Sequence, residues 1–250
     1  MEDILLHGRI PIRKYKAHGK VKHVLLFVHG FGASRAEGTA KELADRLNKE
    51  SIEVLAFDLP SHGENNKTEA LSLQDCMRTL SEVAQFVALE YSGMDTSILG
   101  RSLGGYLALL MLEDSSVNYK NIILIAPAVF IHKSLKEGIL EEHGYRFEDW
   151  EKALDLGYKQ PLFVEKSFYD DLCSKQLENC FSNKRRRFFD VFLARQDSLI
   201  NCEEVQDFFK RKTSSCHSIH IAENSDHDFE DEEEYSKVLD KISEILQEDQ

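Results

Sequence analysis

A serine between glycines stands at residues 100–105, which read Gly-Arg-Ser-Leu-Gly-Gly. The apolar run before it, residues 97–99, predicts a strand, and the run after it, residues 106–111, predicts a buried helix. Gly-x-Ser-x-Gly in this context is typical of a nucleophile elbow, a turn so tight that only small residues fit around the serine. The turn would raise the hydroxyl at a helix N-terminus, where negative charge is favoured. The pattern therefore predicts that Ser102 is a nucleophile.

A serine hydroxyl is a poor nucleophile at its own pKa, so it needs a base that is itself oriented by a carboxylate. For a serine on such a turn, the acid and then the base follow it along the chain. Five histidines follow Ser102, namely His132, His143, His217, His220 and His227. Of these, His227 lies in a polar loop after the last predicted strand. We predict that His227 is the base, the alternative being a surface histidine in an acidic loop.

The orienting acid is expected at the end of the preceding strand, residues 188–194. Asp197 comes directly after that strand and is our candidate. Asp190 is a rival, but it lies inside the strand. Asp226 and Asp228 are too close to His227 in sequence to reach its far ring nitrogen easily.

An oxyanion hole needs two N–H groups that point at the developing alkoxide. Leu103, directly after the nucleophile, provides one candidate N–H. Residues 29–32 read His-Gly-Phe-Gly and follow an apolar strand at 24–28, and the N–H of Phe31 is the second candidate. A simple glycine-containing loop is the alternative for residues 29–32.

The elements that must position these residues alternate between strand and helix. Strands are predicted at 4–6, 10–15, 24–28, 52–57, 97–99, 122–125, 188–194 and 217–221. Amphipathic helices are predicted between them, most clearly at 73–91. This alternation predicts an α/β fold with a doubly wound, mostly parallel sheet.

The alternation breaks between residues 130 and 184, where helical patterns at 134–143, 148–156 and 165–181 are rich in aromatic residues. We predict that 130–184 is a helical cap inserted over the sheet edge, and that 1–129 and 185–250 form the core. Ordinary crossover helices are the alternative.

Composition limits the possible partners. The 250 residues, 42% of them hydrophobic, suit one large α/β domain with an insertion or two small domains. A net charge of −13 disfavours nucleic acid and anionic membranes as partners. No apolar run is long enough to span a bilayer, and the acidic N-terminus lacks signal-peptide features, so we expect a soluble cytoplasmic protein. The five cysteines form no C-x-x-C pattern, and we expect neither a metal nor an organic cofactor.

Together these motifs resemble the α/β-hydrolase superfamily, and the resemblance covers nearly the whole chain. It rests on residues 29–32, residues 58–63 (Asp-Leu-Pro-Ser-His-Gly), the elbow at Ser102, Asp197 and His227. In that family the segment matching 60–63 is structural, so His62 is interpreted as a turn residue. Arg101 departs from many relatives, which carry His or another residue before the serine, and could place a cation near the site or in a buried ion pair.

The cap resembles that of small carboxylesterases, including cinnamoyl and feruloyl esterases and monoglyceride-lipase-like enzymes. The resemblance implies a serine carboxylesterase that acts on small to medium acyl or aryl esters through a Ser-His-Asp triad and an acyl-enzyme. A thioesterase or small-peptide hydrolase would use the same triad, and a non-catalytic ligand-binding protein on this fold is a third reading. The sequence leaves the oligomeric state open.

Overall fold

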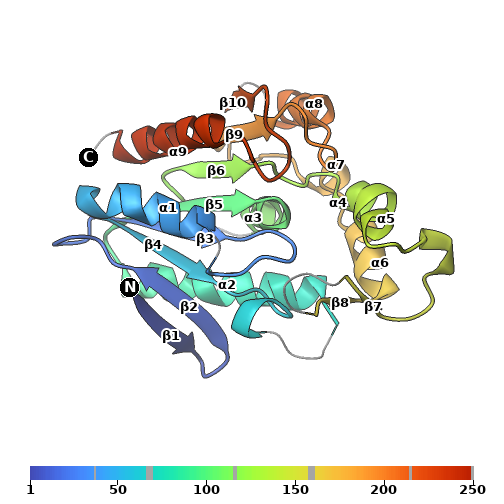
Figure 1. The fold of residues 1–250 in the computed structure, drawn as a ribbon. Helices are drawn as coiled ribbons and strands as arrows, with labels where there is room; N and C mark the ends of the chain where they lie inside the picture. The colour runs from blue at the N-terminus through green and yellow to red at the C-terminus, as the bar shows by residue number, and fades with distance from the viewer. Residues whose placement is uncertain (37, 66–69, 115–116, 157–160, 214–215, 249–250) are drawn as a thin grey trace.

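An eight-stranded sheet forms the centre of the molecule (Figure 1). The computed structural model describes residues 1–36, 38–65, 70–114, 117–156, 161–213 and 216–248. The strand order is β1-β2-β4-β3-β5-β6-β9-β10. The strands are β1 (Glu2–Leu6), β2 (Ile10–Tyr15), β3 (His23–Val28), β4 (Ile52–Phe57), β5 (Asp95–Arg101), β6 (Ile122–Ile125), β9 (Phe189–Ala194) and β10 (His217–Ala222). β1 and β2 form an antiparallel hairpin at one edge, and β2 also runs antiparallel to β4. The other six strands, β4, β3, β5, β6, β9 and β10 in that order, are parallel to one another.

Helices cover both faces of this sheet, so the predicted doubly wound fold is confirmed. One apolar core contains the inward faces of α2 (Leu73–Glu90), α3 (Leu103–Asp114) and α8 (Cys202–Thr213). The other core contains those of α1 (Gly38–Leu47) and α9 (Glu232–Gln247). Successive side chains of a strand point to opposite faces. Accordingly, Val24, Leu26 and Val28 of β3 join the first core and Leu25 and Phe27 join the second.

The segment between β6 and β9 lies beyond the carboxyl ends of the parallel strands (Figure 1). It contains α4 (Ile131–Ser134), the π-helical turn η3 (Leu135–Ile139), α5 (Leu140–Glu142), η4 (Phe147–Asp149), β7 (Leu154–Asp155), β8 (Phe163–Val164), α6 (Lys166–Ser174) and α7 (Leu177–Cys180). The first three join end to end, as the pattern at 134–143 predicts. The division of the chain at residues 130 and 184 stays a prediction.

The helix predicted at 148–156 is wrong. Its residues form the end of the 3-10 turn η4 and the strand β7, which pairs with β8. Trp150 is buried and its ring lies within 6.3 Å of the rings of Phe147 and Tyr169. Tyr145 also donates a hydrogen bond to the carbonyl of Asp155. These tertiary contacts outweigh the local helix preference.

The predicted helix at 165–181 is divided in two. α6 ends at Ser174, and α7 begins at Leu177. Lys175 closes α6 through backbone hydrogen bonds to residues 171 and 172, and Gln176 has an extended ψ of 122°. The hydroxyl of Tyr106, on the elbow helix, donates to the carbonyl of Lys175 at this break.

Candidate active site

Ser102 occupies a strained turn between β5 and α3. Its φ is +50°, in the left-handed region that residues with a side chain rarely adopt. The flanking glycines allow the turn, because a Cβ on Gly100 would overlap the backbone of Gly104 and one on Gly104 would overlap the carbonyl of Val28. The turn therefore has the geometry that the Gly-x-Ser-x-Gly pattern predicts.

The structure brings Ser102, His227 and Asp197 into one hydrogen-bonded chain. His227 Nε2 lies 3.1 Å from Ser102 Oγ, and His227 Nδ1 lies 2.7 Å from Asp197 Oδ2. Asp197 follows β9 and His227 follows β10, so both loops extend from the carboxyl ends of strands in the same parallel part of the sheet as β5. The Asp197 side chain is 1% exposed and that of His227 is 18% exposed. The arrangement has the hydrogen-bond order of a nucleophile, a base and an orienting acid.

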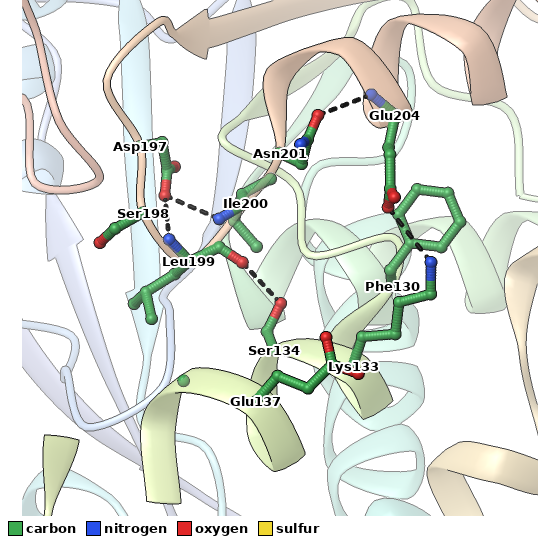
Figure 2. Close-up of a pocket in the computed structure, with 11 residues that line it drawn as sticks. Phe130, Lys133, Ser134, Glu137, Asp197, Ser198, Leu199, Ile200, Asn201 and Glu204 are labelled. Atoms are coloured by element: carbon green, nitrogen blue, oxygen red, sulfur yellow. Dashed lines mark hydrogen bonds and ion pairs between the residues drawn. The ribbon is translucent and has the colours of Figure 1, made fainter. Parts of the chain in front are cut away.

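The second oxygen of Asp197 is held by its own loop. Oδ1 accepts hydrogen bonds from the N–H groups of Leu199, at 2.9 Å, and Ile200, at 2.7 Å (Figure 2). The carboxylate is therefore fixed in orientation, with Oδ2 left to face the imidazole.

The two proposed oxyanion donors lie on segments that meet beside Ser102. Leu103 is the first residue of α3, so its N–H is one of those that the helix itself cannot pair. The loop of Phe31 runs past the serine, because a Cβ built on Gly30 would lie 3.2 Å from Ser102 Cβ. The two N–H groups stay a prediction as oxyanion donors.

Two buried histidines hold the Phe31 loop, a role that the sequence did not reveal for His62. His62 Nε2 accepts the N–H of Gly32 at 3.0 Å, and His29 Nε2 accepts the N–H of Leu59 at 3.0 Å. Burial lowers the pKa of His29 to about 4 and that of His62 to about 3. Both rings are therefore neutral acceptors that tie the loop after β3 to the loop after β4. The repeated His-Gly pair was the available signal.

Arg101 connects the turn at Ser102 to the loop of His227. Its guanidinium donates to the carbonyls of His227 and Asp228, at 3.4 and 3.3 Å, and to Thr39 Oγ1 at 3.0 Å. It also pairs with the Asp228 carboxylate at 3.2 Å. The cation expected near the site is thus neutralised by Asp228, and its contacts hold the backbone of residues 227–228.

The other histidines and the rival acid lie elsewhere. His217 and His220 are on β10, where His217 bonds Thr213 and His220 faces Asp190 at 3.8 Å. His132 lies in α4. His143, which follows α5, lines the cavity at Ser102, a position that its sequence context did not indicate.

Three cavities surround the site, and we name them by position. The catalytic cavity, about 190 Å³, is lined by Ser102 and His227 together with Phe31, Ile139 and Leu199. The side cavity, about 560 Å³, shares Phe31 and Arg101 with it and extends toward residues 161–162. The outer groove, about 380 Å³, lies between α4–η3 and the loop of Asp197 (Figure 2).

Comparison with known proteins places the chain in a family. Residues 19–184, about two thirds of the chain, match the family described as serine aminopeptidase, S33. The chain belongs to the S33 family. Among the residues that the structure describes, no helix is both long and apolar enough to cross a membrane.

The S33 chain is also similar to individual curated proteins. It is 26% identical over 167 residues to the dihydrolipoyllysine-residue acetyltransferase component of the acetoin cleaving system of Cupriavidus necator, covering 64% of this chain and 41% of that protein. It is 29% identical over 120 residues to monoglyceride lipase of Homo sapiens, covering 47% and 39%. The chain thus spans about two fifths of the length of these relatives.

Solved structures share the fold of the S33 chain. Est1E from Butyrivibrio proteoclasticus superimposes with a TM-score of 0.74 at 16% identity, covering 96% of this chain and 92% of Est1E. A second structure of Est1E has ferulic acid bound. At this identity the likeness establishes a common α/β-hydrolase fold.

Proposed function

We propose that the protein is a serine carboxylic-ester hydrolase that acts on small to medium acyl or aryl esters. The observation that carries the proposal is the hydrogen-bonded chain from Ser102 through His227 to Asp197, with the serine raised on a strained turn. The match to monoglyceride lipase and the fold shared with Est1E, which binds ferulic acid, support an ester substrate.

In the proposed mechanism, Ser102 Oγ attacks the ester carbonyl while His227 Nε2 takes its proton. Asp197 keeps the imidazole oriented and stabilises its charged form. The N–H groups of Phe31 and Leu103 bind the oxyanion. His227 then protonates the leaving alcohol, and the acyl-enzyme remains on Ser102. His227 next activates a water molecule, which releases the acid and restores the serine.

Hydrolysis of p-nitrophenyl esters, methyl ferulate and an acyl-CoA by the wild type and Ser102→Ala tests the proposal. Because Ser102→Ala removes one oxygen from an otherwise unchanged turn, the variant should fold and show no ester turnover above background. Equal activity in the two proteins would reject the mechanism. A preference for the acyl-CoA would instead indicate a thioesterase.

Peptide hydrolysis is a second candidate, and one feature of the cavity favours it. Glu142, an exposed carboxylate at the end of α5, lines the catalytic cavity with His143. A carboxylate there provides a partner for the ammonium group of an unblocked amino acid or peptide. Turnover of amino-acid p-nitroanilides, lost in Glu142→Gln while butyrate ester turnover persists, would identify this activity. Ester turnover without any anilide turnover would exclude it.

A further inference from the structure

The catalytic cavity and the outer groove share part of their lining, which we call the wall. Ser134, Leu199 and Ile200 line both the catalytic cavity and the outer groove. These residues therefore separate the 190 Å³ space at Ser102 from the 380 Å³ groove beyond. In Figure 2 the Leu199 side chain lies between the loop of Asp197 and the helix that carries Ser134 and Glu137.

The backbone of this wall is fixed from both sides. The N–H of Leu199 is bound to Asp197, and its carbonyl accepts a 2.8 Å hydrogen bond from Ser134 Oγ at the end of α4. The side chain of Leu199 meets the cap segment at Gly138 of η3, where a Cβ would lie 2.9 Å from Leu199 Cδ2. Glycine at 138 thus leaves the space that the leucine occupies.

We propose that Leu199, seated against Gly138, limits the length of the substrate arm that enters the catalytic cavity. The inference rests on the proposed ester hydrolysis and names its substrate class, which is esters with one short arm. The other arm has the larger side cavity of about 560 Å³, which begins at Phe31 and Arg101. Close-packed walls discriminate by size because a chain one methylene too long must displace them.

The polar lining of the outer groove determines how a substrate chain would bind there if the wall were removed. Lys133 and Glu204 form an ion pair there at 3.3 Å, and Glu137 and Asn201 also line it. A chain that passes the wall would enter polar surroundings, where further methylenes add little binding energy. Opening the wall should therefore extend the accepted length and then give a plateau.

The experiment measures kcat/KM for two ester series that each vary one arm. One series is p-nitrophenyl alkanoates from acetate to dodecanoate, and the other is alkyl acetates from methyl to octyl. In Leu199→Ala the ratio of kcat/KM for the longer esters to that for the shortest ester should rise about tenfold or more in one series, the discrimination that one or two methylenes support. The backbone N–H that binds Asp197 is retained, and the ratio cancels any general loss of rate.

Gly138→Ala provides the opposite change. Its new methyl group would push Leu199 away from the outer groove and into the catalytic cavity, so the accepted length should shorten. In the Leu199→Ala background the same substitution meets no Cδ2 and should have no effect on the profile. The two substitutions should thus be strongly non-additive.

Leu154→Ala is the matched control, because Leu154 is also half-buried and lines none of the three cavities described above. Its profile should equal that of the wild type. An unchanged profile in Leu199→Ala, or an equal shift in Leu154→Ala, would overturn the inference. Absence of Ser102-dependent hydrolysis of any ester would reject the proposed function instead. In that case the rate at which alkyl phosphonofluoridates of graded length label Ser102 measures the same length limit. Equal dependence of the labelling rate on alkyl length in the wild type and in Leu199→Ala would overturn the inference.

Discussion

Replacing Asp197 by Asn tests the catalytic chain most sharply, because the structure determines which way the new amide must face. Oδ1 accepts the N–H groups of Leu199 and Ile200. Only the oxygen of an asparagine can accept both bonds, so its NH₂ group must point at His227 Nδ1. The imidazole must then accept at Nδ1 and carry its proton on Nε2, facing Ser102.

In that tautomer the ring has no lone pair for the serine proton. Replacement of the acid by its amide in other serine triads lowers the rate by about 10⁴. Four decades correspond to about 5 kcal/mol of transition-state stabilisation. We expect a loss of this size in kcat/KM, measured on p-nitrophenyl butyrate at pH 7 with Ser102→Ala as the background.

Asp190→Asn is the control for this substitution. Burial raises the pKa of the Asp190 carboxyl, and the group faces His220 on β10, away from the catalytic chain. We expect kcat/KM within about threefold of the wild type and an unchanged melting curve. If Asp197→Asn lost less than tenfold, or if Asp190→Asn lost as much, the assignment of the acid would be refuted.

Three further predictions concern the surroundings of the site. Arg101→Met should lower kcat by about 10–100-fold with little change in KM, because the guanidinium positions the loop of His227 and misplacement of a catalytic group is costly. Arg101→Lys should recover part of the lost kcat. An unaltered kcat in Arg101→Met would contradict this positioning role. Gly104→Ala should destabilise the fold by about 3 kcal/mol or more in urea denaturation, since its Cβ overlaps a backbone carbonyl. The melting temperature should fall as the pH drops from 6.5 toward 4, because burial lowers the pKa of His29 and His62 and the unfolded chain therefore binds more protons in that window. His62→Asn should make the melting temperature depend less on pH. A wild-type melting temperature that does not change with pH would contradict the neutral state of the two buried rings.

The residues of the hydrogen-bonded chain could be selected from sequence because their motifs follow buried strands in a fixed order. Parallel strands bring their carboxyl ends to one edge, so residues 95 and 30 positions apart meet there. The contacts of Arg101, and of Leu199 with Gly138, could not be selected in this way. They depend on side chains that contact residues 61 to 127 positions away in the chain.

Long-range contacts also decide the secondary structure of residues 148–156, which the sequence pattern did not predict. Their pattern favours a helix, but the burial of Trp150 against rings of η4 and α6 decides the outcome. Local preference is a weak guide where a short segment is covered by tertiary contacts.

The order of the strands has a consequence for how the protein acquires its activity. Ser102 and His227 are 125 residues apart in the chain, and His227 follows β10, which lies at the edge of the sheet. During synthesis the elbow, β5 and β6 emerge long before the last strand can pair with β9. Contacts of such high sequence separation form slowly. Recovery of the proposed ester hydrolysis should therefore coincide with the slowest phase of refolding, so turnover would report when the sheet is complete.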